Sequence, residues 1–206
     1  MTRMKSLFAT EIYEAQLSPK LGVRLNAELA RAVKSLAADD GAGKRWCRER
    51  GYQGYTSYGS LSDLTWRDPS IAELAQYLDK SASVFARKLQ FALDGAQLML
   101  DSLWVNLLTP GGGHSGHIHP HSALSGTYYV TAPAGSGAIK FEDPRLPLMM
   151  AAPLRQESAA AHRQNFAYIE PRPGLLLMWE SWLRHEVMPN RAKLPRISIS
   201  FNYAVR

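Results

Sequence analysis

Apolar residues recur at helical spacing in two stretches of the first half of the chain. In the first stretch they are Leu25, Leu29, Val33 and Leu36. In the second they are Ile71, Leu74, Leu78, Phe85 and Leu89. The first stretch ends at Asp39-Asp40-Gly41, whereas the second begins at Asp68-Pro69, a capping residue before proline, and ends at Asp94-Gly95. We therefore predict two helices that bury these positions, preceded by a short strand over residues 7–13.

The second half of the chain alternates short β-compatible segments with turns rich in proline and glycine. The segments are residues 96–108, 126–130, 138–141, 174–179 and 196–204. Short strands at this spacing are typical of a sandwich or jelly roll. Residues 145–168 are the least regular, and we expect a long insertion between strands there. The pattern predicts one mainly β domain over residues 1–206, with a helical support region (1–95) and a jelly-roll core (96–206).

Composition narrows the class of protein only slightly. Hydrophobic residues make up 46% and charged residues 20% of the chain, which is ordinary for a globular domain. The formal net charge is +6, but the basic residues are spread along the chain and form no run longer than two. No zinc-finger, basic-zipper or RNA-recognition pattern accompanies them. We therefore expect a general attraction for anionic substrates and no nucleic-acid partner.

Cysteine usage and the N-terminus bear on the compartment. Cys47 is the single cysteine, so no intrachain disulfide can form. The first residues lack the apolar stretch of a signal peptide. No window approaches the roughly 18 apolar residues that span a bilayer. These features predict a cytoplasmic protein without a membrane segment.

Four of the six histidines fall within eight residues, at His114, His117, His119 and His121. Alternate residues of a strand point to one face, so His117 and His119 could bind one ion together. A third candidate, His185, follows 66 residues after His119. Three protein ligands leave positions open on a divalent first-row metal. We predict a metal site of His117, His119 and His185, with His114 and His121 in the loop or around the site.

A predicted strand beginning at Arg196 adds a second chemical signal. Arg196, Ser198 and Ser200 share one face of the segment Arg-Ile-Ser-Ile-Ser-Phe-Asn. A guanidinium inside an apolar roll needs an anionic partner, because an unpaired buried charge is very costly. A carboxylate on a small ligand, held by both arms of the guanidinium, would satisfy it. An internal salt bridge to Glu142 or Asp143 is the alternative.

Several short motifs occur together and in order between Trp104 and Asn202. They are Trp-x-Asn at Trp104–Asn106, His-x-His-Pro, Ser-Gly-x-Tyr-Tyr-Val, Phe-Glu-Asp-Pro-Arg and Arg-x-Ser-x-Ser-Phe-Asn. In these motifs the chain resembles the 2-oxoglutarate- and Fe(II)-dependent oxygenases, and more narrowly an uncharacterised bacterial and phage group of them. The opening Leu-Phe-Ala-Thr-Glu-Ile-Tyr resembles the start of that group as well. The resemblance covers most of the chain.

The resemblance implies a double-stranded β-helix, a cupin-like jelly roll, with Fe(II) and 2-oxoglutarate as cofactors. It implies that His117 and His185 bind iron and that Arg196 pairs with the far carboxylate of 2-oxoglutarate. Residues expected to assist at the cosubstrate are Ser198, Tyr129, Ser125, which shares the face of Tyr129, and Asn106. Arg145 is a candidate contact for the cosubstrate or for an anionic substrate.

The chain departs from the wider superfamily at His119, where aspartate or glutamate is usual. His119 could complete a three-histidine site, as in cupin-type thiol dioxygenases, which use no 2-oxoglutarate. Alternatively, His119 could lie outside the ligand set, leaving two histidines with water or a carboxylate from Glu142 or Asp143. We favour direct ligation by His119.

Three hypotheses for function follow. The leading one is an oxygenase that couples conversion of 2-oxoglutarate to succinate and CO2 with hydroxylation of a polar or anionic small molecule or peptide. The second is a three-histidine dioxygenase without 2-oxoglutarate, and the third is a cupin-like binding protein without turnover. A homodimer is expected, because the helical half covers only one side of the roll. The glycine- and tyrosine-rich segment 51–59 is either a cover over the site or a connector.

Overall fold

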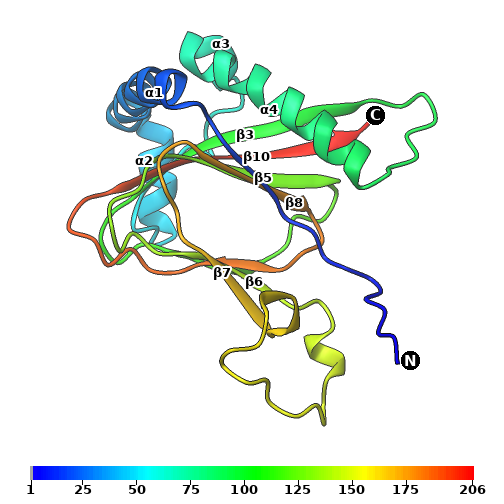
Figure 1. The fold of residues 1–206 in the computed structure, drawn as a ribbon. Helices are drawn as coiled ribbons and strands as arrows, with labels where there is room; N and C mark the ends of the chain where they lie inside the picture. The colour runs from blue at the N-terminus through cyan, green and yellow to red at the C-terminus, as the bar shows by residue number, and fades with distance from the viewer. Residues whose placement is uncertain (1) are drawn as a thin grey trace.

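Two antiparallel sheets face each other, and helices cover the outer face of the larger sheet (Figure 1). This computed structural model describes residues 2–206. The helices are α1 (Pro19–Asp39), α2 (Gly41–Glu49), α3 (Leu64–Arg67) and α4 (Pro69–Lys88), with 3-10 turns η1 (Leu146–Leu148) and η2 (Ala161–Arg163). The strands are β1 (Tyr13–Gln16), β2 (Gly54–Thr56), β3 (Leu98–Leu108), β4 (His114–His117), β5 (Leu124–Thr131), β6 (Ile139–Glu142), β7 (Phe166–Ile169), β8 (Leu175–Glu180), β9 (His185–Val187) and β10 (Arg196–Val205).

The order of the strands is that of a jelly roll. The larger sheet runs β1-β8-β5-β10-β3-β2 and the smaller one β4-β9-β6-β7. Consecutive strands such as β4 and β5 lie in different sheets, so the chain crosses between the layers repeatedly. The fold predicted from the sequence, mainly β with N-terminal helices, is confirmed. Among the described residues no helix is long and apolar enough to cross a membrane.

Side-chain alternation along β10 builds both the core and the interior between the sheets. Ile197, Ile199, Phe201 and Tyr203 join the cluster that packs under the helices. Arg196, Ser198, Ser200 and Asn202 point the other way and line a cavity between the sheets. Each fully buried Ile or Phe stabilises the fold by about 1.5–3 kcal/mol, so the apolar positions fix the register of the strand. That register in turn places the polar side chains inside the roll.

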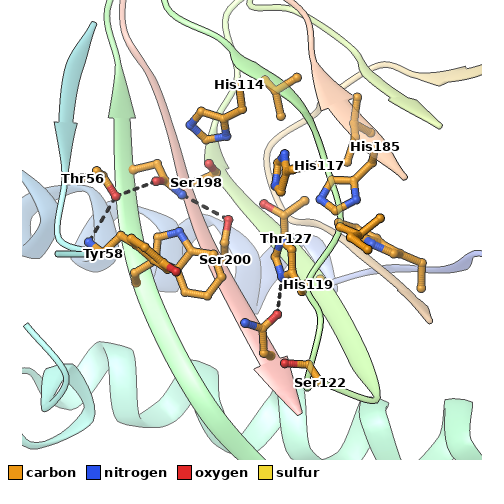
Figure 2. Close-up of a pocket in the computed structure, with 18 of the residues that line it drawn as sticks. Thr56, Tyr58, His114, His117, His119, Ser122, Thr127, His185, Ser198 and Ser200 are labelled. Atoms are coloured by element: carbon orange, nitrogen blue, oxygen red, sulfur yellow. Dashed lines mark hydrogen bonds between the residues drawn. The ribbon is translucent and has the colours of Figure 1, made fainter. Parts of the chain in front are cut away.

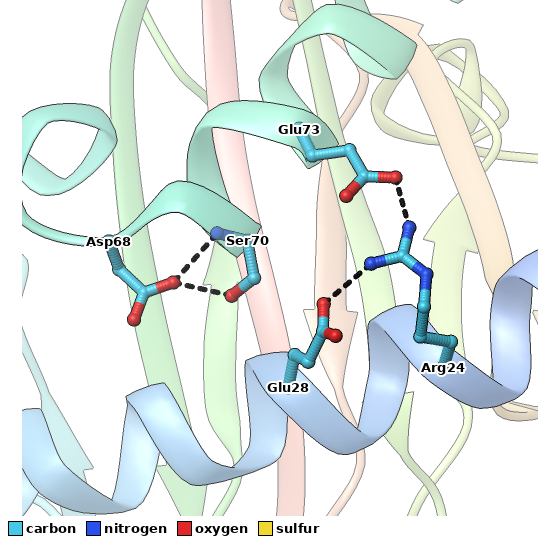
Figure 3. A network of polar contacts seen from close by, with 5 residues as sticks. All are labelled: Arg24, Glu28, Asp68, Ser70 and Glu73. Carbon is cyan, nitrogen blue, oxygen red and sulfur yellow. Dashed lines mark hydrogen bonds and ion pairs between the residues drawn. The ribbon is translucent and has the colours of Figure 1, made fainter.

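Helices α1 and α4 cover the larger sheet with the apolar stripes that the sequence predicted. The predicted positions Leu25, Leu29, Ile71 and Leu74 are all fully or almost fully buried in this cluster. Exposed ion pairs link the two helices on the outside: Arg24 contacts Glu28 one turn along α1 and Glu73 on α4 (Figure 3). Exposed pairs contribute little, so apolar burial holds the helices in place.

The helical region also contains elements that the sequence did not predict. Asp40 ends α1 and immediately caps α2, where its Oδ1 accepts the Gly43 N–H (2.9 Å). The first strand is β1 at Tyr13–Gln16, later than the predicted residues 7–13. Within segment 51–59, β2 pairs with β3, so this segment is not only a loop. The larger sheet therefore takes both of its edge strands from the first 95 residues.

The irregular segment predicted over residues 145–168 projects from the smaller sheet (Figure 1). It contains the turns η1 and η2 and ends where β7 begins at Phe166. Leu148, Met150 and Leu154 on it are at least 83% exposed. The segment lies between β6 and β7, as an insertion between strands would.

Candidate metal centre

A cavity of about 440 Å3 lies between the two sheets. Its walls come from β3, β5, β8 and β10 of the larger sheet and β4, β6 and β9 of the smaller sheet. Helix α2, segment 52–58 and the turn at residues 118–122 complete them. The volume lies within the range of small-molecule sites, about 300–1,000 Å3. Within residues 2–206, the side chains that line it include no Asp, Glu or Lys and a single Arg, Arg196.

His117, His119 and His185 meet at one wall of this cavity (Figure 2). One ring nitrogen of each lies within 4.8 Å of the corresponding nitrogens of the other two. The pairing of β4 with β9 places His117 opposite His185, with ring centroids 4.4 Å apart. The ring of His119 stacks on that of His117 at 5.1 Å. The structure thus brings together the three histidines singled out in the sequence, in a group that contains no carboxylate.

Each of the three rings has its Nδ1 next to a carbonyl oxygen. Nδ1 of His117 lies 2.7 Å from the Ser115 carbonyl, and that of His185 lies 2.9 Å from the Leu183 carbonyl. Nδ1 of His119 lies 2.5 Å from Oδ1 of Asn202. A carbonyl oxygen only accepts, so these contacts place the proton on Nδ1 and leave the lone pair of Nε2 for a ligand. Metal-binding histidines characteristically have such a partner.

Burial keeps the rings of His119 and His185 uncharged. It lowers the pKa of His185 to about 3 and also holds the pKa of His119 below its usual value. A metal binds the unprotonated imidazole, so at neutral pH both rings are in the state that ligation requires. Three neutral nitrogen donors suit a divalent first-row metal.

The expectation that His117 and His119 share a strand was wrong. β4 ends at His117, and His119 lies in the turn that follows. There its backbone N–H donates to the Ser181 carbonyl (3.0 Å), which ties the turn to the end of β8 rather than extending β4. Pro120 and a left-handed His121 (φ 79°) then reverse the chain. The side chain of His119 reaches the cavity from this turn.

The other two histidines of the cluster differ from each other. His121 is exposed at the edge of the cavity. The ring of His114 is enclosed, and burial lowers its pKa to about 4. Its Nε2 lies 2.8 Å from the hydroxyl of Tyr52, which comes from the glycine- and tyrosine-rich segment. The segment stands out in the sequence by its glycines and tyrosines. Its contact with His114 could not be predicted, because Tyr52 and His114 are 62 residues apart.

Arg196 lies at another part of the cavity wall and is 1% exposed. Its Nη1 donates to the Gly137 carbonyl (3.1 Å), while its Nε has no hydrogen-bond partner among the residues that the structure describes. Within residues 2–206 no carboxylate lies within ion-pair distance of it. The predicted alternative partners are engaged elsewhere: Glu142 pairs with Arg184 (3.2 Å) and Asp143 with Arg145 (2.7 Å). The internal salt bridge to Arg196 is therefore not formed.

Two further buried polar groups on the cavity wall lack partners in the described part of the chain. They are the hydroxyl of Tyr129 and the indole N–H of Trp179. The Arg196 guanidinium carbon lies 5.7 Å from the ring centroid of Tyr129, so a donor hydroxyl and a cation lie close together. Ser198 stands beside them, opposite Tyr129 on β5 and Asn106 on β3. The Tyr129 hydroxyl, an unsatisfied buried donor beside a cation, fits a carboxylate.

The remaining predicted cosubstrate residues lie in different places. Asn106 lines the cavity, but its Oδ1 already accepts hydrogen bonds from Thr56 (2.9 Å) and Tyr52 (3.3 Å), and its Nδ2 donates to Ser200 (3.1 Å). Ser125 does not line the cavity. It lies behind His119, with its Oγ 3.0 Å from Nδ1 of that ring.

Arg145 does not reach the cavity either. It lies at the start of the exposed insertion and forms a two-armed contact with Asp143 (2.9 and 2.7 Å). The contact with Asp143 raises the pKa of Arg145. A role for Arg145 at the cosubstrate therefore has no support in this arrangement.

Residues 102–202 match the model of a family described as "Putative 2OG-Fe(II) oxygenase". The matched segment holds the three histidines and Arg196, and the family resemblance expected from the sequence is confirmed over it. The description names the same pair, iron(II) and 2-oxoglutarate, that we expected as cofactors. The match supports an enzyme of the oxidoreductase type. A comparison with the sequences of curated proteins found no match.

Solved structures of similar fold include three with described activities or ligands. The epimerase SnoN in complex with Fe3+, alpha ketoglutarate and nogalamycin RO is 16% identical, with a TM-score of 0.63 over 95% of this chain and 79% of SnoN. EctD from S. alaskensis with 2-oxoglutarate and 5-hydroxyectoine is 15% identical, with a TM-score of 0.62 over 95% and 72% of the two chains. A Pseudomonas putida prolyl-4-hydroxylase is 14% identical, with a TM-score of 0.59 over 96% and 94%. At these identities the similarity establishes the fold alone.

Proposed function

We propose that the protein is an Fe(II)- and 2-oxoglutarate-dependent oxygenase that hydroxylates a small substrate. The observation that carries the proposal is Arg196, a buried guanidinium with no carboxylate partner in residues 2–206. It lies in the same cavity as three histidines whose Nε2 atoms are free to bind a metal. A dicarboxylate that reaches the metal with one end would neutralise this cation with the other. The similar folds of SnoN and EctD, solved with iron or 2-oxoglutarate, support the proposal.

His117, His119 and His185 would hold the iron, each oriented by the acceptor at its Nδ1. Three protein ligands leave positions for the cosubstrate and for oxygen. When bound, iron and 2-oxoglutarate supply oxygen activation coupled to formation of succinate and CO2. The protein supplies binding, orientation and exclusion of water around them.

Arg196 would bind the far carboxylate through its unpaired Nε and its Nη2, while Nη1 stays on the Gly137 carbonyl. The Tyr129 hydroxyl would donate to the same carboxylate, since it has no other partner within residues 2–206. Ser198 stands next to both and would add a hydroxyl. Charge-assisted hydrogen bonds of this kind are shorter and stronger than neutral ones.

A three-histidine dioxygenase without cosubstrate has one observation in its favour, the absence of a carboxylate from the histidine group. That function provides no anionic ligand to pair with the buried charge of Arg196. An unpaired buried cation is destabilising, so a protein that never binds an anion there gains nothing from it. We therefore place the cosubstrate-dependent activity first.

Titration of 2-oxoglutarate into the Fe(II)-loaded protein under argon tests the proposal. We expect a visible charge-transfer band on addition of 2-oxoglutarate, and saturation at micromolar concentrations. Arg196→Ala should retain Fe(II) but bind 2-oxoglutarate about 30-fold or more weakly, because loss of a charged partner in a buried site costs roughly 2–5 kcal/mol. Unchanged affinity in this variant would exclude Arg196 as the cosubstrate contact, and absence of the band in the parent would exclude the oxygenase.

A further inference from the structure

A row of three aromatic side chains forms one side of the cavity and ends at the metal centre. Its members, Trp46 on α2, Tyr58 after β2 and Trp104 on β3, all line the cavity. Ring centroids lie 6.2 Å apart between Trp46 and Tyr58 and 5.3 Å apart between Tyr58 and Trp104, both edge to face. The ring of Trp104 lies 5.9 Å from that of His119. We call these three residues the aromatic row.

The aromatic row is distinct from the cosubstrate end of the cavity. Register pairs Trp104 with Ser200, four residues further along β10 than Arg196, so the row lies toward the His119 side. Figure 2 shows Tyr58 on the side of the cavity opposite His185. A dicarboxylate between Arg196 and the metal would leave the space in front of the row free.

Exposure differs along the row and is greatest at its middle member, Tyr58, while Trp46 is half-buried. Trp104 is 9% exposed, whereas Tyr58 is 63% exposed although it belongs to the cavity wall. Gly59 packs so closely on Trp46 that a Cβ there would lie 2.4 Å from the indole nitrogen. This contact fixes the indole in place. A fixed aromatic wall that is open to solvent at Tyr58 marks a site for an apolar ligand.

The charged residues around the aromatic row disfavour a positively charged ligand. No Asp, Glu or Lys lines the cavity in the described part of the chain. A cation already lies over the outer end of the row, where the guanidinium carbon of Arg50 is 4.6 Å from the centre of the Trp46 ring. A positively charged ligand would be desolvated here without a counterion, which is unfavourable.

The polar side chains beside the row offer few free hydrogen-bonding groups. Thr56 and Ser200 are both bonded to Asn106, at 2.9 and 3.1 Å, and Tyr52 contacts the same amide. Such a self-satisfied network has little capacity left for the hydroxyl groups of a sugar. The row is therefore better suited to a planar ring than to a polyhydroxylated one.

We propose that the aromatic row is the binding site for the substrate, and that this substrate is a planar aromatic compound without positive charge. This proposal rests on the proposed function, because the bound compound is a substrate only if iron is held at His119, next to the aromatic row. The binding itself needs neither metal nor cosubstrate. It can therefore be measured separately from the oxygenase activity.

Equilibrium dialysis of 2-naphthol against the metal-free protein tests the site. We expect Tyr58→Ala to weaken binding about fivefold to tenfold, the range expected for loss of an aromatic contact and its buried area. Tyr58→Phe should bind as the parent does, since the hydroxyl of Tyr58 has no hydrogen-bond partner among the described residues. Trp66→Ala is the matched control, because Trp66 is 91% exposed and does not line the cavity.

Three further probes test the chemical class. Decahydro-2-naphthol, 2-naphthylmethylammonium and glucose should each bind at least fivefold more weakly than 2-naphthol. Equal binding of any of these probes, or of 2-naphthol to Tyr58→Ala and the parent, would overturn the proposal. Tyr58→Ala should bind 2-oxoglutarate with iron as the parent does. If instead the parent fails to bind iron and 2-oxoglutarate while 2-naphthol binding follows the expected pattern, the proposed function fails and the aromatic site stands.

Discussion

Nδ1 of His119 lies 2.5 Å from Oδ1 of Asn202, and this contact joins the turn after β4 to the inner face of β10. Ser125 supports both partners, because its Oγ lies 3.0 Å from the same ring nitrogen and 2.8 Å from Oδ1 of Asn202. His117 and His185 instead contact backbone carbonyls two residues before them. Of these three rings, His119 alone has side chains rather than the backbone as the partners of its Nδ1.

We expect Asn202→Leu to lower the affinity for Fe(II) by about 10- to 100-fold, the usual cost of removing the group behind a metal-binding histidine. The amide is nearly matched in size by leucine, but the acceptor for the ring N–H is lost. Competition with a chromophoric chelator under argon measures the affinity.

Asn26→Leu is the matched control for this experiment. Oδ1 of Asn26 accepts the Tyr128 hydroxyl (2.6 Å) away from the cavity. We expect this variant to be less stable, with its affinity for Fe(II) unchanged. If Asn202→Leu also keeps the parent affinity, the contact with His119 has no part in holding the metal.

The inner face of β10 shows how far the sequence could define the site. Alternation from Arg196 correctly placed Ser198 and Ser200 in the interior, and the next position on the same face is Asn202. The same rule failed for His119, because β4 ends at His117 and the next residues form a turn. Strand periodicity holds only within a strand, and the sequence does not mark where this one ends.

The helices and strands, too, could be predicted from the sequence only in part. Apolar spacing predicted α1 and α4 because each must bury a stripe against a sheet. It could not predict β1 and β2, which have four and three residues and are defined by pairing with distant strands. The contact between Tyr52 and His114 has the same origin, since it depends on the pairing of β2 with β3.

Replacement of single histidines distinguishes a three-histidine site from a two-histidine site. We expect His119→Ala to lower the affinity for Fe(II) at least tenfold, because one bond between the protein and the metal is lost. His121→Ala should have almost no effect, since His121 is exposed at the edge of the cavity. Isothermal titration with Fe(II) under argon compares the two variants. Parent-like affinity in His119→Ala would assign the site to His117 and His185 with other ligands.

The carboxylate of Asp40 should make stability depend on pH in the acid range. Burial tends to raise its pKa, but hydrogen bonds from the Gly43 N–H, Ser60 and Tyr55 outweigh burial and hold the pKa below the ordinary 3.8. A carboxyl whose folded pKa is depressed stabilises the fold above its unfolded pKa. This contribution is lost as the pH falls from 3.8 through the folded value.

Melting curves of the parent and Asp40→Asn between pH 3 and pH 7 test this expectation. At neutral pH the variant should melt at a lower temperature, because the cap of α2 and the acceptor for Tyr55 and Ser60 are weakened. Between about pH 4 and pH 3 the difference between the two proteins should shrink. A difference that stays constant over this range would show that Asp40 does not titrate there.

Arg196→Met should separate the stability of the protein from its affinity for 2-oxoglutarate. In the ligand-free protein Arg196 is a buried cation without an ion-pair partner among residues 2–206, and burial lowers its pKa. Replacing a buried charge by an apolar side chain of similar size is often neutral or stabilising by about 1–4 kcal/mol. We therefore expect the variant to melt at the parent temperature or several degrees above it.

Ligand-induced shifts in melting temperature complete this test. With Fe(II) under argon, 2-oxoglutarate at about 100 times its parent Kd should stabilise the parent by roughly 2.7 kcal/mol and Arg196→Met by less than about 1 kcal/mol. Arg145→Met, which removes an exposed arginine bonded to Asp143, should keep the parent shift. A variant that is both less stable and still stabilised by 2-oxoglutarate would mean that Arg196 serves the fold rather than the ligand. Equal or higher stability with a much smaller response to 2-oxoglutarate is the result we expect of a charge that is retained for binding.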